Sequence, residues 1–232
     1  RDLTTHESWN GTDAYRGKFK GLFESGTTYN GLTTGFDHIK ELGVTHVQLL
    51  PVFDHGVVDE TRLNDPTYEG IVDGIFNWGY MPENFNVVEG SYSTNPYDGA
   101  VRITEFKEMI QAYHDADLRI IMDVVYNHTG KSGDSNFELI LPGYYFRMNN
   151  DGTYSNGSGT GNETASERYM MSKYIVDSTR LVFDTVVRLV KVPLDIVLGI
   201  VKSFSRILQS DWAGAWQAVK TMTVNVFNGI VQ

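Results

Sequence analysis

The sequence predicts an α/β fold over residues 1–178, followed by an all-helical segment over residues 179–232. Three observations predict this division. A helix pattern followed by a strand pattern occurs twice, both strands are apolar on both faces, and the composition changes near residue 180. Apolar strands that alternate with helices are typical of parallel strands covered by helices. A closed barrel and an open sheet both satisfy this pattern.

The first helix–strand unit covers residues 32–52. Apolar side chains recur at helical spacing at Leu32, Phe36, Ile39 and Leu42. Gly43 follows at the position typical of a helix C-terminal cap. Residues 44–52 form a β-branched and apolar run that ends near Pro51, which predicts a strand.

The second unit repeats this order. Residues 104–116 place Phe106, Ile110 and Tyr113 on one side of a helix, and residues 118–126 form a near-continuous apolar strand. Long connections follow both strands, over residues 53–101 and 127–168. Long loops in compact domains are usually functional, and α/β folds build their sites at the carboxyl ends of strands. We therefore look for the site in these loops.

Residues 76–85 gather four aromatic rings around Gly79. Rigid rings beside a glycine that permits close backbone approach are what a sugar-stacking platform requires. An aromatic minicore beneath a long loop is the alternative.

Residues 123–128 run off the end of the second strand. Asp123, Val125 and Asn127 share one face because side chains alternate along a strand, and His128 begins the loop. A histidine there can donate a hydrogen bond to a ligand hydroxyl, but a structural Asp/His pair fits the spacing equally well.

Asp123 to His128 resembles the first conserved region of the α-amylase superfamily, at the end of the third strand of a (β/α)8 barrel. Further stretches resemble bacterial type I pullulanases, and the match extends nearly continuously over residues 1–178. These stretches are residues 45–52, 77–80, 90–96, 142–145, 155–159 and 163–168. The resemblance implies a partial TIM barrel that reaches the third strand, with Arg1–Leu3 as a remnant of the first.

The resemblance also implies substrate-binding roles. Tyr80 matches the aromatic residue that stacks on the sugar at the cleavage subsite, and His128 matches the histidine that contacts the same sugar. Trp78 and Asn77 lie in the stacking loop of the family. Met81 departs from the aspartate that pullulanases usually have, which affects the expected subsite preference.

Asp123 and Asn127 match positions that shape the strand end and its loop. No cofactor or metal ligand is expected, although the resemblance leaves calcium open. The expected partner is an α-glucan such as pullulan or a branched maltodextrin. Secretion or a cell-surface location is compatible with the resemblance, and the sequence itself does not fix the localisation.

The catalytic acids of the family have no counterpart here. Retaining hydrolysis requires a nucleophile and a general acid about 5 Å apart. The nucleophile is expected shortly after residues 173–178, but no matching stretch follows, and residues 180–232 contain no glutamate. Asp184, Asp195 and Asp211 each lie in an amphipathic helix pattern, where a solvated face is expected. We therefore expect no hydrolysis from this chain alone.

Residues 179–232 depart from the family. Residues 1–179 contain 13 Lys and Arg against 26 Asp and Glu, whereas residues 180–232 contain six against three. The segment has amphipathic helical spacing, with Trp212 and Trp216 one turn apart, and charges too frequent for a membrane span. It weakly resembles phage tail tape-measure helices. A fusion joined near Ser178 is one hypothesis for the change.

The overall charge narrows the classes of partner. A net charge of -10 argues against a nucleic-acid partner, and the absence of cysteine excludes disulfides and thiolate metal sites. The N-terminus has no signal-peptide pattern and suggests that residues upstream were removed. Two alternatives to a hydrolase fragment remain: an interaction protein that self-associates through its helical tail, and a glucan-binding remnant.

Overall fold

The computed structural model describes residues 2–63, 78–180, 200 and 216–224. The chain divides into two compact units, residues 1–175 and 176–232. Each unit is described separately below. Asn77 and most of the predicted tail lie outside the described residues.

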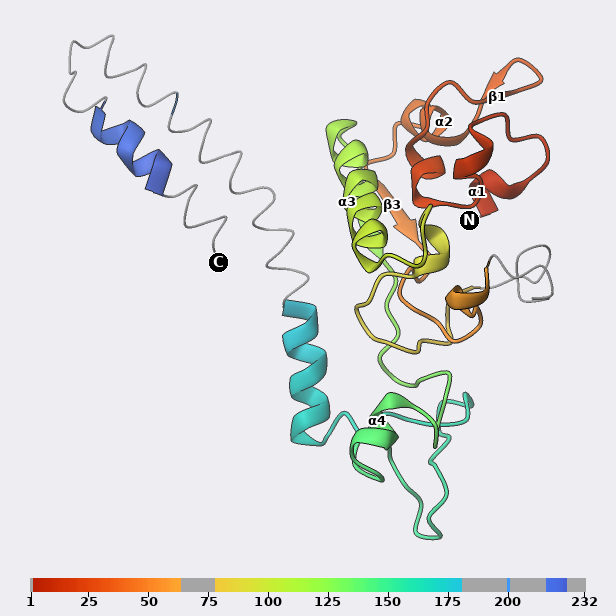
Figure 1. Ribbon diagram of the computed structural model, residues 1–232, viewed down its shortest axis with the longest axis vertical. Helices are drawn as coiled ribbons and strands as arrows, with labels where there is room; N and C mark the ends of the chain where they lie inside the picture. Colours follow the sequence, from red (N-terminus) through yellow and green to blue (C-terminus); the bar gives the residue numbers. More distant parts are fainter. Residues whose placement is uncertain (1, 64–77, 181–199, 201–215, 225–232) are drawn as a thin grey trace. The chain divides into compact units, whose positions relative to one another are not determined.

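The first unit contains short elements joined by long loops (Figure 1). In chain order these are α1 (Asp2–Thr5), η1 (Asp13–Tyr15), η2 (Phe19–Phe23), β1 (Thr28–Tyr29), β2 (Leu32–Thr33), α2 (Gly35–Glu41), β3 (His46–Leu49), η3 (Glu60–Arg62), η4 (Gly90–Tyr92), α3 (Gly99–Asp115), β4 (Arg119–Met122) and α4 (Asn136–Ile140). Residues 169–175 are also helical. The expected strand remnant at Arg1–Leu3 is wrong, because Asp2–Thr5 forms a helical turn.

The predicted helix over residues 32–42 is shorter than expected. Leu32 belongs to β2, which pairs antiparallel with β1, and its side chain is 71% exposed instead of facing the core. The connection between these strands is Asn30-Gly31, and both residues have positive φ angles of 50° and 79°. This is a type I′ hairpin turn, the connection that Asn-Gly favours.

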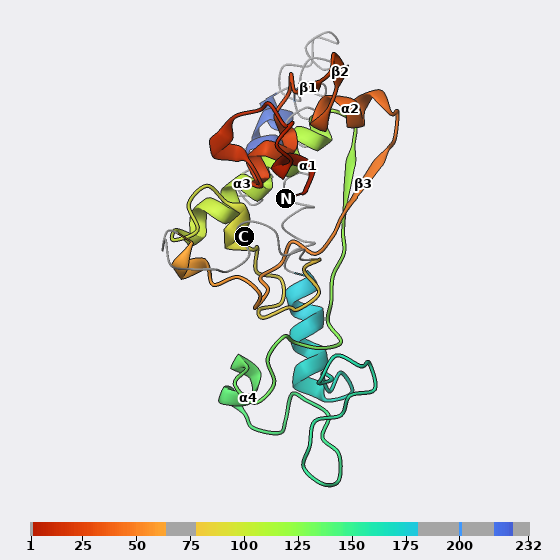
Figure 2. The same cartoon turned by 90° about the vertical axis from the view of Figure 1, so that its right-hand side faces the viewer.

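The predicted parallel pairing is confirmed. β3 and β4 lie side by side in parallel, with His46 opposite Arg119 and Leu49 opposite Met122 (Figure 2). One face of this pair packs against the core through Val47, Leu49, Ile120 and Met122. Ile121, on the other face, is 44% exposed. The expectation of cover on both faces is therefore wrong for the described residues, which form a two-stranded parallel sheet and no closed barrel.

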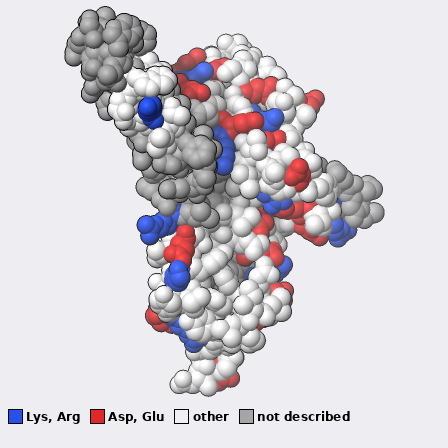
Figure 3. Space-filling view, turned by 60° about the vertical axis from the view of Figure 1, so that its left-hand side comes forward, with Lys and Arg blue, Asp and Glu red and all other residues white. Residues whose placement is uncertain are grey.

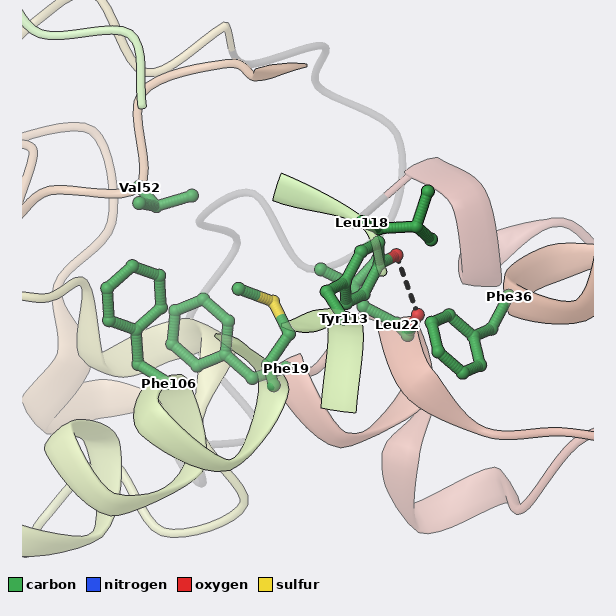
Figure 4. Close-up of a cluster of buried hydrophobic side chains, with 8 residues drawn as sticks. Phe19, Leu22, Phe36, Val52, Phe106, Tyr113 and Leu118 are labelled. Atoms are coloured by element: carbon green, nitrogen blue, oxygen red, sulfur yellow. Dashed lines mark hydrogen bonds between the residues drawn. The ribbon is translucent and has the colours of Figure 1, made fainter. Parts of the chain in front are cut away.

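The core lies between α3, η2, α2 and the covered face of the sheet (Figure 4). Its buried members are Phe19, Leu22, Phe36, Val52, Phe106, Met109, Tyr113 and Leu118. The Tyr113 hydroxyl donates a 2.9 Å hydrogen bond to the Leu22 carbonyl, which satisfies both buried polar groups. α3 begins earlier than the predicted Thr104, because the Asp98 carboxylate accepts from the Ala100 N–H and caps the helix.

Tyr113 should make the unit sensitive to alkali. Burial raises the pKa of Tyr113 to about 12, above its ordinary value of 10.0. A group whose pKa rises on folding contributes stability that is present below pH 10 and is lost as the pH rises through 12.

Tyr113→Phe tests this prediction by urea denaturation at pH 8 and pH 11. At pH 8 the variant should be about 1 kcal/mol less stable, because the Leu22 carbonyl loses its donor. Between the two pH values the variant should lose less stability than the wild type. An equal loss in both proteins would contradict this assignment.

Within the second unit, residues 216–224 are helical. Trp216 is 62% exposed, and the Lys220 ammonium lies 5.9 Å from its ring centroid. The partner residue Trp212 and the rest of the helical prediction lie outside the described residues, so the boundary near residue 178 stays a prediction. No helix in the described part of the chain is both long and apolar enough to cross a bilayer.

On the face shown in Figure 3, acidic and basic side chains are interspersed.

Candidate functional site

Three of the predicted site residues come together at the end of β4. The Tyr80 hydroxyl donates a 2.6 Å hydrogen bond to Oδ2 of Asp123, the first residue after the strand. Nε2 of His128 lies 2.8 Å from the Tyr80 carbonyl oxygen. Because a carbonyl can only accept, Nε2 carries the hydrogen. Tyr80 is thus held at its ring hydroxyl and at its backbone.

The platform, which we define as Trp78, Tyr80 and Met81, presents apolar side chains to solvent. The exposed fractions are 57% for Trp78, 36% for Tyr80 and 42% for Met81. An exposed tyrosine ring whose hydroxyl is fixed from the side can receive the C–H face of a sugar without losing further freedom.

His128 is 4% exposed, and its Nδ1 atom has no hydrogen-bond partner among the described residues. The sequence predicts a donor at this position. In the structure the Nε2–H donates to the Tyr80 carbonyl instead, and in the tautomer with its hydrogen on Nε2 the buried Nδ1 atom is an acceptor. A ligand hydroxyl that reached Nδ1 would donate to it.

Two glycines allow the platform loop to pack closely against the neighbouring backbone, Gly79 at Pro51 and Gly130 at Met81. Gly79 has a φ of 79°, and a Cβ there would lie 2.6 Å from the Pro51 carbonyl oxygen at the end of the first strand region. A Cβ at Gly130 would lie 3.0 Å from the Met81 carbonyl oxygen, and its N–H donates to the Pro82 carbonyl at 2.8 Å. A side chain at Gly79 would therefore displace the loop that carries Tyr80.

The platform loop continues into an irregular pairing that the sequence did not reveal. The Gly56 N–H donates to the Met81 carbonyl at 3.0 Å, and the Glu83 N–H donates to the Asp54 carbonyl at 2.9 Å. On the other side of this segment, the Asp54 N–H donates to the Val87 carbonyl at 2.8 Å. Residues 53–56 therefore lie behind the platform as the middle segment, bonded to residues 81–83 on one side and to Val87 on the other.

Asn127 contributes to the site region through its backbone. It is exposed, and its carbonyl accepts a 3.0 Å hydrogen bond from the Thr164 N–H. The Thr164 hydroxyl donates to the neighbouring Tyr126 carbonyl at 2.7 Å. These bonds fasten the long second loop to the strand end, and the shaping role of Asn127 stays a prediction.

Three carboxyl groups, those of Asp54, Glu60 and Glu89, lie within 4.8 Å of one another behind the platform. The Arg102 guanidinium pairs with Glu60, and the Gly90 N–H donates to the same carboxylate at 2.6 Å. Asn84 donates to Asp54 at 2.5 Å. Because a guanidinium and several N–H donors already serve these oxygens, we do not assign them as metal ligands.

The Tyr80–Asp123 bond has a spectroscopic consequence. The hydrogen bond to Asp123, aided by desolvation and by the carboxylate charge, raises the pKa of Tyr80. Asp123→Ala should return the pKa of Tyr80 toward its ordinary value. Asp123→Asn keeps a hydrogen-bond acceptor, so it should hold the Tyr80 ring in position without supplying the carboxylate charge. NMR titration of ring-labelled tyrosine checks this.

Asp115→Ala on α3 is the matched control, because this exposed carboxylate contacts Gln111 and not a tyrosine. An unchanged Tyr80 titration in Asp123→Ala would mean that the hydrogen bond does not hold the ring in solution.

The part of the chain that contains this site is similar to known proteins. The model of the α-amylase catalytic domain matches residues 8–139, more than half of the chain. The chain belongs to the α-amylase catalytic-domain family. The matched range includes the platform, β4 and His128, so the candidate site lies within the part of the chain that matches the family.

The relatives of this α-amylase-family chain include pullulanases. It is 47% identical to the pullulanase of Bacillus subtilis over 178 residues, which is 76% of this chain and 23% of that protein. It thus spans about a quarter of the length of this curated relative.

Solved structures give the same result. A pullulanase from Paenibacillus barengoltzii, in complex with maltohexaose and α-cyclodextrin, is 51% identical with a TM-score of 0.68, covering 77% of this chain and 27% of that one. The pullulanase from Bacillus acidopullulyticus is 41% identical with a TM-score of 0.68, covering 78% and 21%. A partial TIM-barrel fold of the pullulanase type is therefore present.

Proposed function

We propose that this chain binds α-glucan through the platform and His128, as the corresponding part of a pullulanase-type hydrolase, and that it does not cut the glycosidic bond alone. The observation that carries the proposal is the Tyr80 ring, exposed to solvent yet fixed by Asp123 and His128. A fixed ring loses little conformational entropy when a sugar stacks on it.

The relatives support the proposed substrate class. The Paenibacillus barengoltzii pullulanase was solved with maltohexaose and α-cyclodextrin, and that of Anoxybacillus sp. LM18-11 with maltotetraose. The identity of this chain to these enzymes, 51% and 47%, supports the same class of ligand. Pullulan and branched maltodextrins are the expected ligands.

The proposed lack of hydrolysis rests on the missing acids. Retaining cleavage requires two carboxyl groups about 5 Å apart on either side of the scissile bond. Asp123 is the acid at the platform, and its carboxylate accepts from Tyr80. The close group of Asp54, Glu60 and Glu89 is engaged by Arg102 and includes the fully buried Glu89, which a sugar cannot reach.

Affinity electrophoresis in gels that contain amylopectin tests the binding proposal. Retardation that maltohexaose relieves, and that cellohexaose does not relieve, is expected, because stacking and hydroxyl contacts depend on the shape of the α-linked chain. Equal mobility with and without amylopectin would contradict the proposal.

A further inference from the structure

Glu89 lies behind the platform and plays no part in the proposed contact with sugar. It is completely buried, and its carboxylate accepts hydrogen bonds from the His55 N–H at 3.2 Å and the Ser91 N–H at 2.8 Å. Its own N–H donates to the Val52 carbonyl at 2.9 Å. A buried acid that holds two backbone segments together fixes their separation.

The segment that Glu89 holds is the one that backs the platform. His55 is bridged antiparallel to Pro82, and the Gly56 N–H donates to the Met81 carbonyl at 3.0 Å. Met81 is the residue after Tyr80. The connection from the Glu89 carboxylate to the platform therefore passes through one segment, residues 53–56, and its backbone hydrogen bonds.

The charges that face Glu89 are unbalanced. Carboxyl oxygens of Asp54 and Glu60 lie within 4.8 Å of it and of each other, while Arg102 pairs with Glu60. The His55 Nε2 atom lies 3.7 Å from the Glu89 carboxylate. Nearby, Glu83 forms an ion pair with Lys131 at 2.5 Å. Among the described residues, one guanidinium stands against the carboxylates of Asp54 and Glu60 before Glu89 ionises, so a third negative charge is unfavourable.

These surroundings place the titration of Glu89 in the neutral range. Burial raises the pKa of Glu89 to about 7, and the charge of Glu60 acts in the same direction. Burial lowers the pKa of His55, so its ring is neutral near pH 7 and does not compensate the Glu89 charge. Burial also raises the pKa of Asp54.

We propose that the Glu89 carboxyl is a positioning group that, by taking up or releasing one proton, tightens or loosens residues 53–56 behind Tyr80 and so sets the upper pH limit of glucan binding. The inference rests on the proposed function. Glu89 acts on the sugar only through the backbone of the platform.

The direction follows from the raised pKa. The folded protein holds the proton between the ordinary value of 4.5 and about 7, whereas the unfolded chain has released it. The contribution to stability is therefore fully present below pH 4.5 and is lost as the pH rises to about 7. Above that pH the ionised carboxylate accepts more strongly from the His55 and Ser91 N–H groups, but its burial and its repulsion from Glu60 outweigh this gain, so the anchored segment loosens.

Glu89→Gln, an isostere of the protonated acid, tests the inference. In buffers with EDTA, the wild type should lose about threefold or more in affinity for maltohexaose between pH 6 and pH 8.5, since one linked proton allows up to about tenfold per pH unit. The variant should show a smaller change. His128 is present in both proteins, so the comparison between them removes its own contribution.

Hydrogen exchange without ligand separates this inference from the proposed function. The His55 and Gly56 amides should lose protection above pH 7 in the wild type and keep it in Glu89→Gln. Maltohexaose could fail to bind at any pH while the protection of these amides still changes with pH. That result would support the role of Glu89 and contradict the proposed function. Equal pH profiles of protection in the two proteins would overturn the inference.

Glu105→Gln is the matched control. Glu105 is also buried and accepts the Thr94 N–H at 2.9 Å, but its carboxylate does not contact residues 53–56 through any described hydrogen bond. This variant should keep the wild-type pH profile. If Glu89→Gln does not fold, carbon-13 NMR of the Glu89 carboxyl in the wild type replaces it, and a midpoint near the ordinary value of 4.5 would overturn the inference.

Discussion

Tyr80→Ala should reduce the affinity for maltohexaose by about tenfold or more, since an aromatic face contributes about 0.5–1.5 kcal/mol beyond the area that it buries. The loss is expected to be large because the ring is already fixed. Its hydroxyl donates to Asp123 and its carbonyl accepts from His128, so the sugar meets an ordered surface. The alanine variant removes the ring and leaves the Asp123 carboxylate without its donor.

Isothermal titration of the wild type and the variant with maltohexaose measures this effect. Tyr29→Ala is the matched control, because Tyr29 is a 52% exposed tyrosine in the β1–β2 hairpin. The control should bind like the wild type. If Tyr80→Ala also binds like the wild type, the sugar stacks elsewhere and the platform is an aromatic minicore.

Met109→Ala should have the largest effect on stability, lowering the free energy of unfolding by about 2–5 kcal/mol. Met109 is completely buried in the cluster that joins α3 to η2 and the sheet. Truncation removes contacts with neighbours that the short surrounding elements cannot easily restore. The same cluster supports β4, at whose end Asp123 lies, so glucan binding should weaken in parallel.

Urea denaturation of Met109→Ala and of Ile103→Ala checks this prediction. Both residues lie on α3, but Ile103 is 48% exposed, so its truncation should cost less than about 1 kcal/mol. Similar losses in the two variants would mean that the described core does not set the stability of the unit.

The sequence predicted the parallel pairing because both strand segments carry the continuous apolar pattern that it requires. It misplaced the start of the first helix, since the apolar Leu32 fits helical spacing while Asn30-Gly31 directs it into a hairpin. The local turn preference outweighs the periodicity here. No local signal in the sequence indicated that one sheet face would be exposed among the described residues, because the cover of a sheet depends on segments distant in sequence.

The candidate site was only partly accessible to sequence reasoning. Tyr80 and Asp123 are 43 residues apart, and no spacing rule predicts their hydrogen bond. The family resemblance identified both residues, but not which groups bond to each other. Glu89 was missed because a single glutamate in a loop carries no pattern, and its importance arises from burial and from contacts made across the fold.

The central claim is that the chain binds α-glucan without cutting it. Calorimetric titration of the purified protein with a branched maltodextrin, beside a reducing-sugar assay on pullulan, tests this most directly. We expect heat of binding and no release of reducing ends. Release of reducing ends would show that acids within this chain complete the reaction, and absence of both signals would contradict a glucan-binding role.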